Sequence, residues 1–285
     1  MRGTTEQPLL APLLGGQAGW GAGRRTATGA SLAAAAVSWA MLMAPLGALV
    51  AHLTPSTVER ALSAPGALQP LVVSVEAGAA SLVALVVVGT PLGWLLARTT
   101  GAVASVLEAG MLAMLLLPPL VIGLLLVFLV GPATPVGSLL AHVRLSASNT
   151  LLALVIAQSY EAGPYYVLGA QAAFRVVDPA LPELAQLGGD SGWRSFRRVT
   201  VPLAAPGLVL ALSTAWARAI GAFGAVLIVA YHPYGLPLQI FTTLEETGLA
   251  SALPFAAVLV LVALPLPLAG YYWSSRAERR HRGVA

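Results

Sequence analysis

Six long apolar stretches constrain the fold of this chain more than any other feature. They lie at about 31–53, 71–97, 107–130, 150–174, 202–230 and 249–273. As an α-helix that rises about 1.5 Å per residue, the shortest stretch spans roughly 35 Å, more than a hydrocarbon core of about 30 Å. Charged residues make up only 9% of the chain, whereas a water-exposed surface usually needs about 25%. The sequence therefore predicts an all-α membrane protein with six transmembrane helices.

The distribution of arginine indicates the orientation of these helices. All 15 basic residues are arginine. With a cytoplasmic N-terminus, only Arg60 and Arg144 fall outside and Arg218 falls within the fifth stretch, while all the others are cytoplasmic. Because cytoplasmic loops carry the excess of positive charge, both termini are predicted to be cytoplasmic. The chain is thus expected to be a multi-pass protein of the plasma (cell inner) membrane, in contact with lipid.

The stretches also divide the chain into three parts. Residues 1–28 are rich in Gly, Ala and Thr without periodicity, which predicts a disordered cytoplasmic tail. Residues 29–275 form the transmembrane domain, whose longest cytoplasmic loop is 174–202, and 276–285 form a short cytoplasmic tail. Arg24 and Arg25 precede an apolar run as in a twin-arginine signal, but five further spans favour an uncleaved first helix.

Several kinds of chemistry are excluded by composition. The chain has no cysteine and no lysine, which excludes disulfides, thiolate nucleophiles and the lysine of a Walker A loop. If ATP drives this protein, another chain must hydrolyse it. Neither a metal-binding histidine spacing nor a catalytic triad or carboxylate pair is present, so no metal, cofactor or enzymatic activity is expected. The net charge of +4 comes from arginines at helix ends rather than from a nucleic-acid surface.

The loop 174–202 carries the signals of a short helix. Asp178 is expected to be its N-cap, with Pro179 at the first helical position. Leu181 and Leu184 give the helix one apolar side, and the pair Gly188-Gly189 is expected to end it. A second segment, 193–201, leads into the fifth span at Pro202. By local physics alone this is an ordinary amphipathic loop helix.

The spacing of this loop resembles the EAA loop of bacterial ABC importer permeases: Glu-Ala-Ala, three residues, Gly, nine residues, Ile, one residue, Leu-Pro. The matching positions are Glu183, Ala185, Gly189, Val199 and Pro202. The chain departs from the pattern by having leucine at 184, valine at 201, and an aspartate, Asp190, where a small residue is usual. The resemblance implies a coupling helix that docks on an ATPase subunit. Arg194, Arg197 and Arg198 would either add contacts to the ATPase or anchor the topology.

A second resemblance covers about 71–269. The segment WARAIGAFGAVLIVAYHPYGLPLQIFTTLEETGLASALPFAAVLVL is similar to the last two spans of molybdate and tungstate permeases, and sulfate permeases share much of it. Ala222 departs from the family, which usually has Glu there. The resemblance implies the type I ABC importer permease fold and an oxyanion as substrate.

Buried charges offer the best candidates for a translocation path. A guanidinium in lipid costs about 3 kcal/mol or more, so Arg218 should face the bundle. It either attracts an oxyanion or, as we favour, pairs with a carboxylate, for which Glu161 and Glu76 are the buried candidates. The path residues are then expected to be Arg218, Gly221, Phe223, Gly224 and Pro164.

The mechanism implied by the resemblance is alternating access driven by two cytoplasmic ABC ATPase subunits. The other partners are a second permease copy, most simply in a homodimer, and an extracytoplasmic substrate-binding protein. The alternatives are a sulfate or thiosulfate permease, another ABC importer permease, or a proton-coupled secondary transporter with Glu76 or Glu161 as relay. The sequence leaves open which oxyanion is carried and whether the two permeases are identical.

Overall fold

The computed structural model describes residues 29–282, and all regular elements in that range are helices. Contacts divide the chain into two units, Met1–Val50 and Ala51–Ala285. The described part of the first unit belongs to α2 (Gly29–His52), an apolar helix whose side chains, such as Trp39 and Leu42, are exposed. The tail predicted for 1–28 lies outside the described residues. The tail predicted from residue 276 is helical as far as α16 (Pro265–Arg282) extends.

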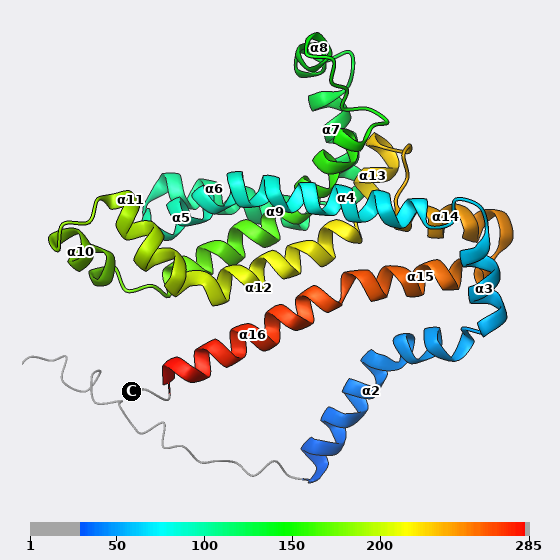
Figure 1. Ribbon diagram of the computed structural model, residues 1–285, viewed down its shortest axis with the longest axis horizontal. Coiled ribbons are helices and arrows are strands. Elements are labelled where there is room, and N and C mark those ends of the chain that lie inside the picture. Colours follow the sequence, from blue (N-terminus) through cyan, green and yellow to red (C-terminus); the bar gives the residue numbers. More distant parts are fainter. Residues whose placement is uncertain (1–28, 283–285) are drawn as a thin grey trace, which may run out of the picture. The chain divides into compact units, whose positions relative to one another are not determined.

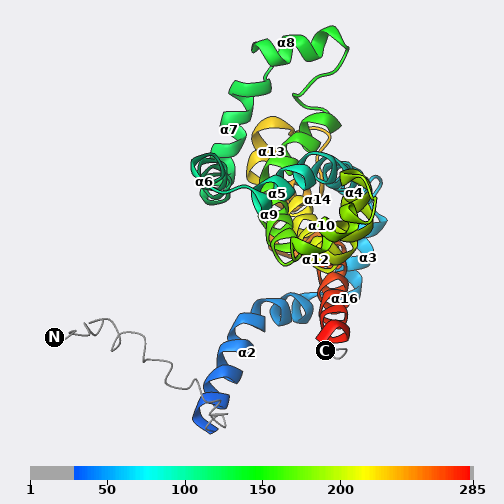
Figure 2. The ribbon, with the colours of Figure 1, turned by 90° about the vertical axis from the view of Figure 1, so that its left-hand side faces the viewer.

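Three helices form the centre of the second unit. α4 (Gln69–Ala84), α9 (Leu151–Arg175) and α12 (Val201–Ile220) run side by side (Figure 1), and Figure 2 shows them clustered in end view. Small residues bring α9 and α12 together. A Cβ atom on Gly169 would lie 2.6 Å from Ala211 Cβ, and one on Gly207 would lie 2.6 Å from Ala173 Cβ. This close backbone approach is the usual way in which membrane helices associate.

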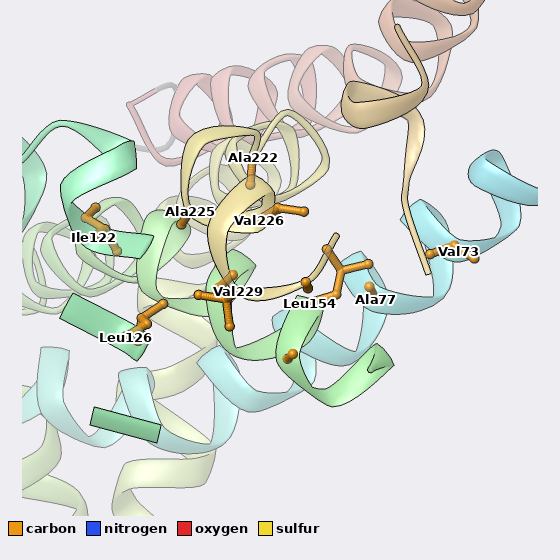
Figure 3. Packing of buried hydrophobic residues seen from close by; sticks show 12 residues of the cluster. Val73, Ala77, Ile122, Leu126, Leu154, Ala222, Ala225, Val226 and Val229 are labelled. Carbon is orange, nitrogen blue, oxygen red and sulfur yellow. The ribbon is translucent and has the colours of Figure 1, made fainter. Parts of the chain in front are cut away.

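Two hydrophobic clusters fill the space around α9. One surrounds its C-terminal half and contains Phe174 and Ala215. The other joins its N-terminal half to α4, α7 and α13, with Leu154, Ala77 and Val226 among its members (Figure 3). Ala222 belongs to this second cluster and is almost fully buried. A carboxylate at position 222, as in the family that the sequence resembles, would therefore lie in apolar surroundings in this chain.

Prolines explain two π-helical turns. η1 (Leu85–Gly89) precedes Pro91 in α5 (Thr90–Arg98), and η2 (Phe196–Thr200) precedes Pro202 in α12. Proline has no N–H, and its ring clashes with the carbonyl four residues earlier; the wider π turn accommodates both effects. Residues 69–98 are consequently one continuous helix, in which Pro91 follows a widened turn and not a break.

The third predicted span is broken. The chain bends by 116° between α6 (Ala102–Leu116) and α7 (Pro119–Val130). The break falls at Pro118 and Pro119, so the predicted span 107–130 is not one straight helix. A short helix, α8 (Pro135–His142), follows α7 and projects with it away from the central helices (Figure 2).

The fifth predicted span, 202–230, is wrong in length. α12 ends at Ile220, Gly221 closes it by donating its N–H to Ala217 O at 3.1 Å, and a separate helix, α13 (Gly224–Val229), follows. The apolar sequence hides this break because hydropathy does not register backbone hydrogen bonds. After α13, the chain forms α14 (Leu236–Thr247) and then α15 (Leu249–Ala263), which continues into α16.

Four of the described helices are long and apolar enough to cross a membrane, and the bent pair α6–α7 would be a fifth. The four are Ser31–His52, Gln69–Arg98, Gly192–Ile220 and Leu249–Arg276. α9 is long enough but less apolar, since its buried face includes Gln158, Glu161 and Gln171. A helix that is enclosed by other helices has less need of lipophilic side chains.

The two ends of the second unit carry different short helices. α10 (Ala180–Leu187) and α11 (Gly192–Ser195) lie at one end, while α3 (Pro55–Ser63) and α14 lie at the other (Figure 1). α15 packs against both α3 and α14.

Candidate functional site

The loop between α9 and α12 contains the short helix that the sequence predicts. α10 begins at Ala180, one residue later than expected, with Pro179 in the N-cap position. Asp178 still acts at this terminus, because its Oδ1 accepts a hydrogen bond from the Ala180 N–H at 2.9 Å. The shift of one residue leaves the expected capping chemistry in place.

Glycine ends α10 as expected. Gly189 has φ of +98°, donates its N–H to Gln186 O at 3.0 Å, and is followed by Asp190, whose N–H reaches Ala185 O at 3.0 Å. This pair of hydrogen bonds is the Schellman motif, in which glycine accepts the left-handed conformation at low cost. The stop predicted at Gly188-Gly189 is confirmed.

α10 presents apolar side chains to the outside. Leu184 is 62% and Leu187 is 85% exposed, Glu183 beside them is exposed, and Ala185 is half-buried. On its inner side, Pro182 is buried and its carbonyl accepts a hydrogen bond from Ser195 Oγ at 2.8 Å, which ties α10 to α11. The exposed leucines form an apolar patch on a helix that this hydrogen bond holds in place.

Asp190, the unexpected charge in the loop, forms ion pairs with two arginines that follow it in the chain. Its Oδ1 lies 3.6 Å from Arg194 Nη1 and 3.6 Å from Arg198 Nη1. These ion pairs link the turn after α10 to the helix that enters α12. Val199 is half-buried and Pro202 is exposed, both on that same helix. Among residues 29–282 no ion pair is formed by Arg197, which is exposed.

A half-buried ion pair lies at the centre of the second unit. Arg218 Nη2 on α12 is 2.6 Å from Glu161 Oε2 on α9, and the Glu161 side chain is fully buried. The other carboxylate oxygen, Oε1, accepts a hydrogen bond from the Ala225 N–H at 3.0 Å. Oε2 has no aligned hydrogen bond, so its contact with Arg218 is an ion pair. Glu161 thus holds together α9, α12 and the start of α13, and the interpretation that Arg218 pairs with a carboxylate is confirmed.

The prediction that Glu76 is buried is wrong. Glu76 is exposed on α4, because the buried face of that helix is formed by Val73, Ser74, Ala77 and Gly78, which lie on its other side. It therefore does not pair with Arg218 in this chain.

The candidate path residues fall into two groups. Arg218, Gly221 and Phe223 are close in sequence around the end of α12; Gly221 is exposed, and Phe223 packs against Phe241 with ring centroids 5.3 Å apart. Gly224 and Pro164 instead lie inside the packed unit. A Cβ atom on Gly224 would come within 2.8 Å of the Leu120 backbone nitrogen, and Pro164 is fully buried in α9.

A further polar cluster was not anticipated. Glu108 Oε1 on α6 lies 2.5 Å from Arg175 Nη2, and the same oxygen accepts a hydrogen bond from Gln171 Nε2. Gln171 Nε2 also donates to Leu96 O at 3.3 Å. The cluster joins α5, α6 and α9. The spacing of four between Gln171 and Arg175, which places both on one helix face, is the sequence signal that could have revealed it.

Comparison with known proteins identifies the class. Residues 89–282 match the family described as binding-protein-dependent transport system inner membrane component. The chain belongs to this family. It is a multi-pass membrane protein and a transport subunit of an ABC importer, not an enzyme.

The most informative relatives share a narrower description. The chain is 38% identical over 236 residues to a probable molybdenum ABC transporter permease protein of Haloferax volcanii, covering 83% of this chain and 86% of the relative. It is 33% identical over 208 residues to a molybdenum transport system permease protein of Azotobacter vinelandii, covering 71% and 92%. A molybdate/tungstate permease of Thermococcus kodakarensis is 30% identical over 192 residues, covering 66% and 70%.

Solved structures support the same fold. A bacterial alginate ABC transporter chain aligns with a TM-score of 0.64 at 14% identity, covering 87% of this chain and 93% of that one. A chain of the MetNI methionine ABC transporter aligns with a TM-score of 0.55 at 20% identity, covering 75% and 95%. At these identities the likeness is one of fold, that of ABC importer permeases.

Proposed function

We propose that this chain is the permease subunit of an ATP-driven importer whose substrate is molybdate or tungstate. The observation that carries the proposal is the 38% identity, over 83% of the chain, to a probable molybdenum permease. Relatives named for molybdate and tungstate together favour these two anions over sulfate or thiosulfate.

The loop between α9 and α12 is the element that would receive force from the ATPase. Its exposed leucines and Glu183 could bind in a groove on a partner. The hydrogen bond of Ser195 to Pro182 and the ion pairs of Asp190 connect α10 to the helix that enters α12. In this proposal Glu183, Ala185 and Gly189 form the docking core. Asp190, Val199 and Pro202 support it from the loop that leads into α12.

The transport cycle is alternating access. Two ATPase subunits close on ATP, the two α10 helices follow them, and a pair of permease chains opens outward to receive an anion from a binding protein. We propose a homodimer, with six spans per chain, both termini in the cytoplasm, and a path that passes near Arg218, Gly221 and Phe223. Exposed Gly221 at the end of α12 supports this placement of the path.

Uptake into proteoliposomes tests the substrate. The permease, its ATPase and its binding protein are reconstituted, and ATP-dependent uptake of molybdate, tungstate and sulfate is measured. We expect uptake of molybdate and tungstate. Vanadate should inhibit this uptake, and a protonophore should leave it unchanged. Uptake of sulfate alone would overturn the substrate, and uptake that resists vanadate but stops with a protonophore would indicate a secondary transporter.

A double variant tests the coupling loop. Glu183→Arg with Gly189→Asp places a reversed charge and a strained side chain at the docking core. We expect loss of uptake and of ATPase binding, with unchanged insertion of the permease. Normal uptake by this variant is incompatible with the docking assignment.

A further inference from the structure

Two pockets that share Gln239 are lined by α3, α14 and neighbouring segments. Figure 1 shows α3 and α14 at the end of the second unit opposite to α10. The larger, of about 310 Å³, is an open pocket lined by α3, α14 and α15, and Arg60, Thr243 and Ser251 contribute to its wall. The smaller, of about 290 Å³, is lined by the start of α4 and the segment before α14, including Gln69, His232 and Tyr234. Gln239 lines both pockets and joins them.

The hydroxyl groups in the wall of the larger pocket differ in whether their protons are already used in hydrogen bonds. Thr57 and Thr247 use their hydroxyl protons on the carbonyls of Thr54 and Thr243, each at 2.8 Å. Thr243 Oγ1, in contrast, accepts from Gln239 Nε2 at 2.9 Å, which leaves the proton of its own hydroxyl available.

Arg60 supplies the positive charge of this pocket. Within the described part of the chain, neither its guanidinium nor the hydroxyl of Ser251 has a side-chain partner. The four groups that remain available are the Arg60 fork, two hydroxyls and the second N–H of Gln239.

Acidic residues are absent from both walls. The residues that line the two pockets include one arginine, one histidine and several hydroxyl and amide groups, but neither Asp nor Glu. A donor-rich wall without carboxylates favours an anion over a cation at the wall itself, while Glu59, Glu245 and Glu246 on α3 and α14 lie outside the lining and are exposed to solvent. At about 30 Å³ per water molecule, each pocket has room for a tetrahedral anion and part of its hydration shell.

We propose that these pockets form a reception site for a tetrahedral divalent oxyanion, with Arg60, Thr243 and Ser251 as ligands and Gln239 as the link to the second pocket. The inference rests on the proposed function and adds a location at which the anion pauses after it leaves the binding protein. Arg60 is exposed, so the charge-assisted hydrogen bonds remain partly hydrated and the site holds its ligand weakly. Weak binding suits a transit site, because a tightly held anion would not move on.

Direct binding tests the site without the binding protein. The complex of permease and ATPase, in lipid nanodiscs and held with a non-hydrolysable ATP analogue, is titrated with radiolabelled molybdate, and ATPase alone gives the background. We expect saturable binding that tungstate displaces, and about tenfold weaker affinity in Arg60→Gln, since a charged hydrogen-bond donor is lost. Arg60→Lys, which keeps the charge, should recover part of this loss.

Arg144→Gln is the matched control, because it removes another exposed arginine that lines neither pocket. It should bind molybdate as the native complex does. Absence of saturable binding in the native complex, or equal affinity in Arg60→Gln, overturns the site. So does an Arg60→Gln variant that binds molybdate normally but associates weakly with the binding protein, since Arg60 would then be a protein contact. ATP-dependent uptake of molybdate by the native system is measured in parallel; if it persists, failure of the site leaves the proposed function intact.

Discussion

Glu161 and Arg218 carry opposite charges in the apolar centre of the second unit, 2.6 Å apart. The cost of an unpaired guanidinium in lipid made a partner for Arg218 predictable from the sequence. Which carboxylate it would be was not predictable, because Glu76 and Glu161 both lie in apolar stretches. The rotation of α4 decides it, since this helix turns Glu76 away from the packed face.

Replacing only Arg218 should destabilise the protein more than replacing both Arg218 and Glu161. Arg218→Met leaves a fully buried carboxylate without its counter-ion, which costs about 3 kcal/mol or more. Adding Glu161→Gln removes the charge but keeps an oxygen for the Ala225 N–H. Thermal unfolding in detergent should show a large fall in Tm for the single variant and recovery of at least half of that fall in the double. Equal or greater loss in the double variant would contradict the account.

Gly224 is required by the close packing of α13 on α7. A Cβ atom at this position would lie 2.7 Å from Pro119 Cβ and 2.8 Å from the Leu120 nitrogen, so Gly224→Ala must displace backbone. We expect a destabilisation of about 1–3 kcal/mol, measured as a lower Tm of the purified permease. Gly110→Ala is the control, because the space around Gly110 is open within 4 Å and alanine favours helix. A similar fall in Tm for both variants would refute the packing argument.

At the scale of elements, the loop between α9 and α12 was largely predictable, because its signals are local. Asp178 and the glycine pair mark the ends of α10 by backbone chemistry that operates within a few residues. The end of α12 was not predictable in the same way. The separate helix α13 that follows is anchored by a hydrogen bond from the Ala225 N–H to Glu161, a residue distant in sequence, and hydropathy alone shows only one apolar run.

Two adjacent glycines in this loop should respond differently to the same substitution. Gly189 has φ of +98°, so Gly189→Ala is strained by roughly 1 kcal/mol, whereas Gly188 has φ of −76° and its added Cβ would meet Ala185 O at an ordinary 3.4 Å. Through the docking helix we expect about fivefold weaker association with the ATPase for Gly189→Ala and near-native association for Gly188→Ala. Binding of purified ATPase to the permease in nanodiscs measures both. Equal affinities of the two variants for the ATPase would show that the Schellman turn does not affect docking.

At the scale of the whole molecule, the number and direction of the spans are predictions that labelling can test. The chain has no native cysteine, so single cysteines can be introduced without background. Ser146→Cys follows α8, and Leu187→Cys is on α10; both native positions are exposed. A membrane-impermeant maleimide applied to intact spheroplasts should label the first, and should label the second only after permeabilisation. The opposite labelling pattern would show that the predicted orientation of the helices is wrong.

The polar character of α9 also has a consequence for how the protein is made. This helix is less apolar than the other long ones and carries Glu161, whose counter-ion Arg218 is synthesised much later. During translation α9 must therefore wait beside the insertion machinery, or enter the bilayer with its carboxyl group protonated, until α12 arrives. We expect the two helices to leave the translocon as a pair, so truncation before Arg218 should leave α9 poorly inserted, and a glycosylation reporter on such truncations would detect it.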